Sequence, residues 1–231
     1  MADASGPKWE SDAVEMLRTH IRKFARPLRD LVDRDANEGD TRVLVTDMLC
    51  DALGYDKYED LTTEYAVRGE FADYGIRIDK QLVAFVEVKR AAQNLNARHL
   101  RQVETYAVKE GVEWMLLTNG QVWRAYHVTT APGSPVETNL VIDVDLLDES
   151  TVNQKAADLF YLHKNAMKRD KIAELWMQRA ATAPEALVDV LLSDPVLDAV
   201  RKEVRRRSGY NPDAAALAAT IRNEVVKENL V

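Results

Sequence analysis

The chain has 231 residues, of which 46% are hydrophobic, and its formal net charge is −7. This length suits one large domain or a core domain with an appendage, and the hydrophobic content is typical of a folded protein. No apolar run reaches the roughly 20 residues that a membrane helix needs. The N terminus lacks a signal-peptide pattern, and the single cysteine excludes an intrachain disulfide framework. We therefore expect a soluble, cytoplasmic protein without a membrane partner.

The acidity is concentrated in one stretch. Between Asp30 and Glu64 there are eleven acidic residues but only three basic ones, Arg34, Arg42 and Lys57. A phosphate backbone would avoid such a face. Basic residues gather elsewhere, most densely from 201 to 207, so the overall charge does not exclude nucleic acid, because binding follows the local potential. The 201–207 cluster is interpreted either as a solvated helix face or as a contact for DNA or a partner protein.

An N-terminal segment, residues 1–36, is predicted to hold one helix over 10–33. Its apolar residues recur at alternating spacings of three and four, which gives one apolar stripe. They are Val14, Leu17, Ile21, Phe24, Leu28 and Leu31. The stripe is short for a coiled coil, so we expect this helix to pack on the body of the same chain, with a dimerisation zipper as the alternative.

Residues 37–147 are predicted to form a mixed sheet crossed by a helix. A first helix should run from about 41 to 53 with Asp40 as its N-cap. Strands are expected at 62–67, 71–78, 81–89, 113–118, 121–128 and 140–147, and a helix at 94–109. The dipeptide Asn119-Gly120 lies between two of these strands and is a strong hairpin signal.

From Ser150 onward the sequence reads as helix, punctuated by Pro184, Pro195 and Pro212. The predicted segments are therefore 1–36, 37–147 and 148–231. The fold class that follows is α/β: a mixed β-sheet flanked by helices, preceded by an N-terminal helix and followed by an all-helical C-terminal extension.

Three charged residues stand at the ends of neighbouring predicted strands. Glu87 and Lys89 are two apart, so they share one face of a strand, and a tight turn can bring Asp73 of the preceding strand beside Glu87. Two close carboxylates repel each other unless a cation intervenes, and Mg²⁺ prefers such oxygen ligands. The alternative is a structural ion pair between Glu87 and Lys89. Isolated charges at the edge of a buried sheet are costly, however, so they need partners or a function.

Gln102 and Tyr106 fall on one face of the predicted helix over 94–109. A glutamine on an otherwise apolar face needs a hydrogen-bonding partner. Phosphate, a metal-bound water or Lys89 would serve, and a backbone contact to a neighbouring strand is the alternative.

Together these residues resemble the PD-(D/E)XK nuclease superfamily. The similarity is to the N-terminal nuclease domain of type I restriction enzyme motor (R) subunits and to stand-alone predicted restriction endonucleases, and it spans roughly 37–128. The motifs that carry it are Asn37-Glu-Gly-Asp-Thr41 through Leu53-Gly54-Tyr55, Glu64-Tyr65, Ala72-Asp73-Tyr74, Phe85-Val-Glu-Val-Lys89, the Gln102-to-Tyr106 spacing, Leu117-Thr-Asn-Gly120 and Trp123-Arg-Ala-Tyr126.

The resemblance implies a restriction-endonuclease-like fold and a set of site residues. Asp73 and Glu87 would be metal ligands together with the backbone carbonyl of Val88, and Lys89 would be the catalytic lysine. Glu38 matches the acidic residue of the first core helix, which would hold a metal-bound water. The accessory residues near the DNA would be Gln102 and Tyr106. The implied cofactor is Mg²⁺, with Mn²⁺ as a substitute. Asp73 follows Ala72 rather than proline, a departure common in this branch.

The function expected from this resemblance is a metal-dependent DNA endonuclease in restriction, phage defence or a mobile element. Two alternatives stay open: a catalytically silent nuclease fold used as a DNA-binding or scaffolding subunit, and a nuclease acting on RNA or branched DNA. The sequence contains no Gly-x4-Gly-Lys-Ser/Thr phosphate loop, so the helicase motor of the R subunit is absent from it. Partners to test are DNA, a second copy of the chain, and a separate motor or methylase subunit.

Overall fold

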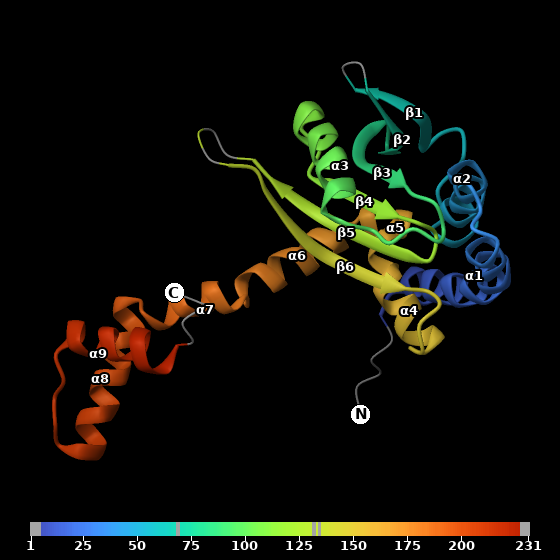
Figure 1. The fold of residues 1–231 in the computed structure, drawn as a ribbon. Helices are drawn as coiled ribbons and strands as arrows, with labels where there is room; N and C mark the ends of the chain where they lie inside the picture. Colours follow the sequence, from blue (N-terminus) through green and yellow to red (C-terminus); the bar gives the residue numbers. More distant parts are fainter. Residues whose placement is uncertain (1–5, 68–69, 131–132, 134, 227–231) are drawn as a thin grey trace. The chain divides into compact units, whose positions relative to one another are not determined.

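The computed structural model describes residues 6–67, 70–130, 133 and 135–226, and Figure 1 shows their elements. The chain divides into two compact units, the first ending at Ala173 and the second beginning at Glu174. The segment boundaries predicted at 36/37 and 147/148 stay predictions. Within the described ranges no helix is long and apolar enough to cross a membrane.

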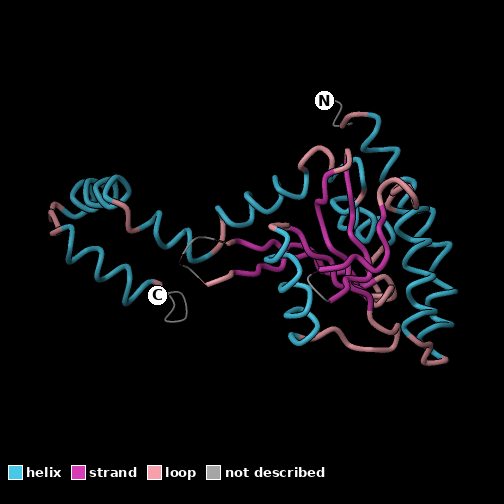
Figure 2. The backbone as a smooth tube through the Cα atoms, turned by 90° about the horizontal axis from the view of Figure 1, so that it is seen from above, coloured by secondary structure: helices cyan, strands magenta, loops and turns pink. Residues whose placement is uncertain are grey.

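The first unit is built around a six-stranded mixed sheet with the strand order β1-β2-β3-β4-β5-β6. Only the β3–β4 pair is parallel, and every other neighbouring pair is antiparallel. The strands are β1 (Leu61–Val67), β2 (Glu70–Ile78), β3 (Gln81–Val88), β4 (Trp114–Thr118), β5 (Val122–Thr129) and β6 (Glu137–Asp145). The predicted α/β class with a mixed sheet flanked by helices is confirmed, and Figure 2 shows the strands between the helices.

The parallel pair requires a crossover, which α3 (Ala97–Glu110) supplies between β3 and β4. One face of α3 buries Val103, Tyr106 and Ala107 in a cluster that includes Phe85 of β3 and Met115 of β4. Because side chains alternate along a strand, Glu87 points to the same side of the sheet as Phe85. The crossover helix therefore covers the face on which Glu87 lies.

Helix α1 (Lys8–Asp33) packs on the first unit, as predicted. The stripe residues Leu17, Ile21, Phe24, Leu28 and Leu31 are buried, and the helix contacts α4 (Val152–Leu159) and the π-helical turn η1 (Met48–Ala52). Full burial of such side chains contributes about 1.5–3 kcal/mol each, which fixes α1 to this unit.

The N-cap predicted for the next helix is wrong. Helix α2 (Glu38–Asp47) begins three residues earlier than expected, because the side chain of Asn37 accepts a hydrogen bond from the Asp40 amide at 2.8 Å. Asn and Asp are comparable capping residues, and with Asn37 as the cap both Glu38 and Asp40 fall in the first turn. Carboxylates there are favoured by the helix dipole.

Helices follow the sheet, as predicted. The first unit also holds the short helices η2 (Phe160–Leu162) and α5 (Lys164–Met167). Helix α6 (Lys171–Ala181) crosses the boundary between the units, and α7 (Pro184–Leu191), α8 (Asp194–Ser208), α9 (Ala214–Thr220) and η3 (Ile221–Val225) make up the rest of the second. Pro184 and Pro195 stand in the first turns of α7 and α8, where proline is tolerated.

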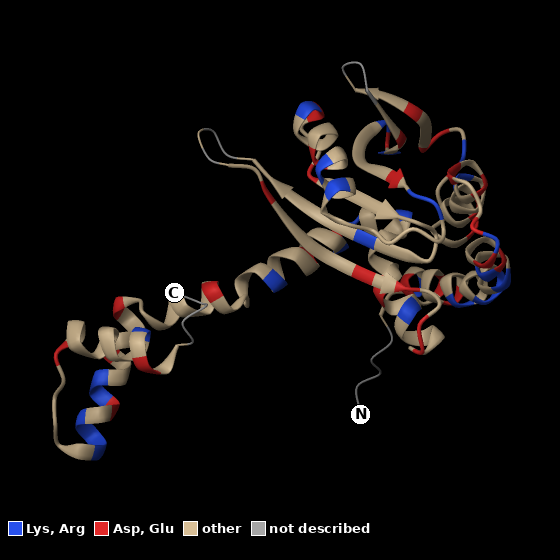
Figure 3. Cartoon of the chain, viewed as in Figure 1, with Lys and Arg blue, Asp and Glu red and all other residues tan. Residues whose placement is uncertain are grey.

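The basic cluster of the sequence lies on α8, where Figure 3 shows Lys and Arg gathered. Several of its charges are paired along the helix. Lys202 contacts Asp198 at 2.7 Å, and both Arg206 and Arg207 contact Glu203 at 2.6 Å. Such exposed pairs contribute little to stability, but they reduce the positive charge that this face offers to a phosphate backbone.

Gly120 lies in the β4–β5 hairpin with φ +83°, and a Cβ there would meet Leu28 of α1 at 3.2 Å. We expect Gly120→Ala to lower the free energy of unfolding by roughly 2–3 kcal/mol, through left-handed strain and crowding. Gly111, at φ +66°, has nothing within 4 Å of such a Cβ, so Gly111→Ala should cost only about 1 kcal/mol. Urea unfolding of both variants measures the difference, and equal losses would contradict the role assigned to the contact with Leu28.

Candidate active site

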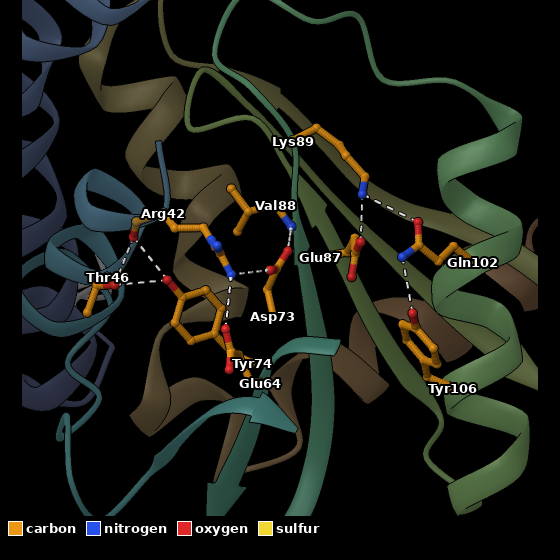
Figure 4. A network of polar contacts seen from close by, with 10 residues as sticks. All are labelled: Arg42, Thr46, Glu64, Asp73, Tyr74, Glu87, Val88, Lys89, Gln102 and Tyr106. Atoms are coloured by element: carbon orange, nitrogen blue, oxygen red, sulfur yellow. Dashed lines mark hydrogen bonds and ion pairs between the residues drawn. The ribbon is translucent and has the colours of Figure 1, made fainter. Parts of the chain in front are cut away.

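The candidate site lies where β2 and β3 separate. Their ladder extends to the pair Tyr74–Val86, and β3 continues beside β4 as far as Val88 and Thr118. Asp73 and Glu87 are the next residues after that last β2–β3 pair. At this point the Asp73 carboxylate takes the place of a strand partner, because its Oδ2 accepts a hydrogen bond from the Val88 amide at 2.7 Å. Figure 4 shows Asp73 and Glu87 at this fork.

Glu87 and Lys89 form a buried ion pair. The Lys89 Nζ contacts Glu87 Oε1 at 2.6 Å, and their side chains are 11% and 4% exposed. The second carboxylate oxygen of Glu87, Oε2, is buried and has no hydrogen-bond partner among the described residues. A buried acceptor without a partner costs about 1–3 kcal/mol, more when it is charged. The ion pair that the sequence offered as an alternative is therefore present, but it leaves one of the two Glu87 carboxylate oxygens without a hydrogen-bond partner among the described residues.

Gln102 and Tyr106 extend this pair toward α3. The Lys89 Nζ donates to Gln102 Oε1 at 3.4 Å, and Gln102 Nε2 donates to the Tyr106 hydroxyl at 3.1 Å. Tyr106 is buried, whereas Gln102 is exposed at the edge of the buried face of α3 rather than at its centre. Of the partners considered for Gln102, the structure provides Lys89.

The position of Lys89 is set by the loop that follows β3. Lys89 lies just past the strand, and its amide donates to the Thr118 carbonyl at 2.8 Å. Beyond it, the Ala91 amide donates to the Thr41 hydroxyl at 3.1 Å, and the Asn119 side chain donates to the Ala91 carbonyl at 3.2 Å. The hairpin predicted at Asn119-Gly120 therefore also anchors the loop behind the lysine, a role that its turn signal did not indicate.

Glu38 lies in the first turn of α2, near the two carboxylates. Its negative charge contributes to raising the pKa of both Asp73 and Glu87. Within the part of the chain that the structure describes, no hydrogen bond or ion pair joins Glu38 to either residue. This arrangement leaves the prediction that Glu38 acts through a water molecule untested.

Arg42 is a site residue that the sequence reasoning missed. Its Nη1 contacts Asp73 Oδ1 at 3.1 Å and lies 4.0 Å from Glu64 Oε1. The signal that could have found it is its isolation, because it is one of only three basic residues in the acidic stretch from Asp30 to Glu64. A basic residue in such an acidic stretch is expected to pair with one of the carboxylates.

Burial and mutual repulsion oppose the ionisation of the two carboxyl groups. Burial, followed by the negative charge of Asp73, raises the pKa of Glu87 to about 7, and the hydrogen bond from Lys89 acts in the opposite direction. Burial also raises the pKa of Asp73, against the Val88 amide and the Arg42 guanidinium, which lower it. Two groups shifted in this way are typical of a functional site.

The residues present fit a divalent cation. An unpartnered buried carboxylate oxygen and two repelling carboxyl groups are what a cation would satisfy, and hard cations prefer oxygen ligands. In the described ranges, no three His, Cys, Asp or Glu side chains gather into a group that could hold a metal. A metal here would therefore depend on Asp73 and Glu87 together with backbone oxygen and water, a set that suits Mg²⁺.

Residues 37–140 match the family model described as type I restriction enzyme R protein N terminus. The match confirms the resemblance inferred from the motifs and contains every predicted site residue, from Glu38 to Tyr106. It indicates a nuclease-type role in restriction for residues 37–140. No curated protein and no solved structure matches the chain.

The raised pKa of Glu87 predicts how stability depends on pH. Between the ordinary value of 4.5 and about 7, the folded protein holds a proton on Glu87 that the unfolded chain has lost. His163 acts in the opposite direction, because burial lowers its pKa to about 4 and the unfolded chain then holds the additional proton. The contribution of Glu87 alone is a fall in the free energy of unfolding, by up to roughly 3 kcal/mol, as pH rises through this window. Urea unfolding in EDTA at several pH values measures it.

Glu87→Gln provides the control for this pH dependence, because the amide cannot titrate. Between pH 4.5 and 7, the free energy of unfolding of the variant should rise relative to that of the unmodified protein by up to roughly 3 kcal/mol. Parallel curves for the two proteins would show that Glu87 does not titrate in this window.

Proposed function

We propose that this protein is a metal-dependent endonuclease that hydrolyses DNA phosphodiester bonds in restriction. The observation that carries the proposal is the orphaned Oε2 of Glu87, whose other oxygen contacts Lys89 at the fork where Asp73 also lies. The family match to the type I restriction enzyme R protein N terminus supports DNA as the substrate. Phage defence or a mobile element is the setting we expect for such an activity.

Asp73 and Glu87 would hold Mg²⁺, or Mn²⁺ in its place, with the Val88 carbonyl as a further ligand. Glu38 would hold a water molecule of the metal. When bound, such an ion supplies charge neutralisation at the scissile phosphate and activates a water molecule. The Val88 amide orients the Asp73 carboxylate for this task, since it holds Oδ2 at 2.7 Å.

Lys89 would act on the substrate itself. An ammonium has three N–H donors, and two of them are engaged in the contacts to Glu87 and Gln102. We infer that Lys89 directs a donor to the attacking water or to the phosphate oxygens, where negative charge builds up in the transition state. Gln102 and Tyr106 then act as positioning residues, because they hold the Lys89 side chain through one amide group.

A nuclease fold that only binds DNA is the alternative function. Loss of the lysine or of one carboxylate would favour it, but Asp73, Glu87 and Lys89 are all present and converge on one place. A nuclease that acts on RNA or on branched DNA would use the same site residues, so only assays with different substrates distinguish it from a nuclease that acts on duplex DNA. A second copy of the chain and a separate motor or methylase subunit remain candidate partners.

Lys89→Ala tests the proposal. We expect the variant to lose at least about 100-fold in the rate of plasmid nicking or linearisation with Mg²⁺ or Mn²⁺, because a group acting in the transition state typically contributes that much or more. Supercoiled plasmid, methylated and unmethylated, is incubated with each protein and with EDTA as the metal-free control. RNA and branched DNA are incubated in parallel.

Lys57→Ala is the matched control, because Lys57 is an exposed lysine and Lys89 a buried one. It should cleave like the unmodified protein. Retained cleavage by a folded Lys89→Ala protein would refute the assignment of the lysine. Absence of cleavage by the unmodified protein on every substrate would favour the binding alternative, or dependence on a missing partner.

A further inference from the structure

The proposed metal ligand Asp73 is already paired with a positively charged side chain. Arg42 Nη1 contacts Asp73 Oδ1 at 3.1 Å, while Oδ2 accepts from the Val88 amide, so both carboxylate oxygens are engaged. The Asp73 side chain is 11% exposed and that of Arg42 is 37% exposed. A guanidinium at this distance neutralises the negative charge of the largely buried carboxylate, and a divalent cation would bind that same charge.

A second carboxylate lies within reach of the same guanidinium. Glu64 Oε1 is 4.0 Å from Arg42 Nη1, and the Glu64 side chain is 74% exposed. Glu64 has φ +47° within β1, and it lies opposite Asp73, between the register pairs Thr63–Tyr74 and Tyr65–Ala72. A non-glycine residue with positive φ is uncommon, and this backbone conformation changes the direction of the Glu64 side chain, whose Oε1 lies near Arg42.

The space between these groups is open. The side chains surround a cavity of about 280 Å³, whose lining includes Arg42, Glu64, Asp73, Thr46, Thr63 and Tyr74. The backbone around Arg42 is held independently of its side chain, because its carbonyl accepts from the Tyr74 hydroxyl at 2.9 Å and from the Thr46 hydroxyl at 2.8 Å. The guanidinium can therefore change partners while α2 stays in place.

We propose that Arg42 is the counter-ion of Asp73 in the metal-free protein and that its guanidinium transfers to Glu64 when a divalent cation binds. The inference rests on the proposed function, since it assumes a metal site at Asp73. Two cations on one carboxylate repel each other, and Glu64, whose Oε1 lies 4.0 Å from Arg42 Nη1, offers the guanidinium another partner. Arg42 thus competes with the metal, and Glu64 weakens the competition. A purely structural ion pair would have neither effect.

Calorimetric titration of Mn²⁺ into the full chain tests the competition, and Asp73→Asn identifies the heat that belongs to this site. Arg42→Gln should lower the dissociation constant about fivefold, the upper range for a partly exposed ion pair. Arg42→Lys keeps the charge and should stay within about twofold of the unmodified protein. Circular dichroism checks that each variant is folded.

Arg90→Gln is the matched control for long-range charge. Arg90 follows Lys89 but pairs with Asp35 at 3.3 Å rather than with Asp73. Its dissociation constant should change less than about twofold, because exposed charges are screened. An equal gain in Arg90→Gln, or no gain in Arg42→Gln, would overturn the inference.

A double-mutant cycle tests the transfer itself. The cycle measures whether the interaction between Arg42 and Glu64 strengthens when the metal binds. Glu64→Gln should weaken Mn²⁺ binding about threefold more when Arg42 is present than when it is replaced by Gln. Equal weakening in the two backgrounds would mean that Arg42 does not move to Glu64.

Two outcomes separate this inference from the proposed function. If the unmodified protein binds no Mn²⁺ at Asp73, the proposed function fails and the inference with it. If the protein binds Mn²⁺ but Arg42→Gln gains nothing, only the inference fails. Should Arg42→Gln not fold, Glu64→Gln is compared with Glu59→Gln, an exposed glutamate. Only Glu64→Gln should then weaken binding, and equal effects would overturn the proposal.

Discussion

The separation of β2 from β3 beyond the pair Tyr74–Val86 is the constraint on which the candidate site depends. A strand that loses its neighbour must satisfy its amide groups in another way. Here the Val88 amide donates to Asp73, so one hydrogen bond both ends the ladder and orients a carboxylate. Because β3 continues along β4, Glu87 and Lys89 are carried past the end of the β2–β3 ladder into the same place.

The carboxylates at this fork are held in an unfavourable state. Burial and the charge of Asp73 raise the pKa of Glu87, and its Oε2 lacks a partner within the described part of the chain. Lys89, just past the end of β3, pairs with Glu87, and Arg42 of α2 pairs with Asp73. If the proposed cation binds at this site, it should stabilise the folded protein, because a ligand that binds only the folded state does so.

The surrounding structure keeps this arrangement rigid. Helix α3 covers Phe85 and brings Gln102 to Lys89, and Asn119 of the β4–β5 hairpin holds the loop behind the lysine. Asn37 sets the start of α2 and so places Glu38 in its first turn. Each support comes from a different element, which explains why the motifs span most of residues 37–128.

The sequence by itself determined the element types and the principal charged residues. Hydrophobic periodicity is a local property, so it predicted the stripe of α1, the strands and the crossover helix, and the Glu-Val-Lys pattern marked Glu87 and Lys89. The N-cap at Asn37 was missed because Asn37 and Asp40 are nearly equivalent caps. Only the tertiary structure decided the pairing of Arg42 with Asp73, the left-handed backbone at Glu64 and the anchoring role of Asn119. These contacts join residues far apart in the chain, or depend on how two strands diverge, and no local pattern encodes either.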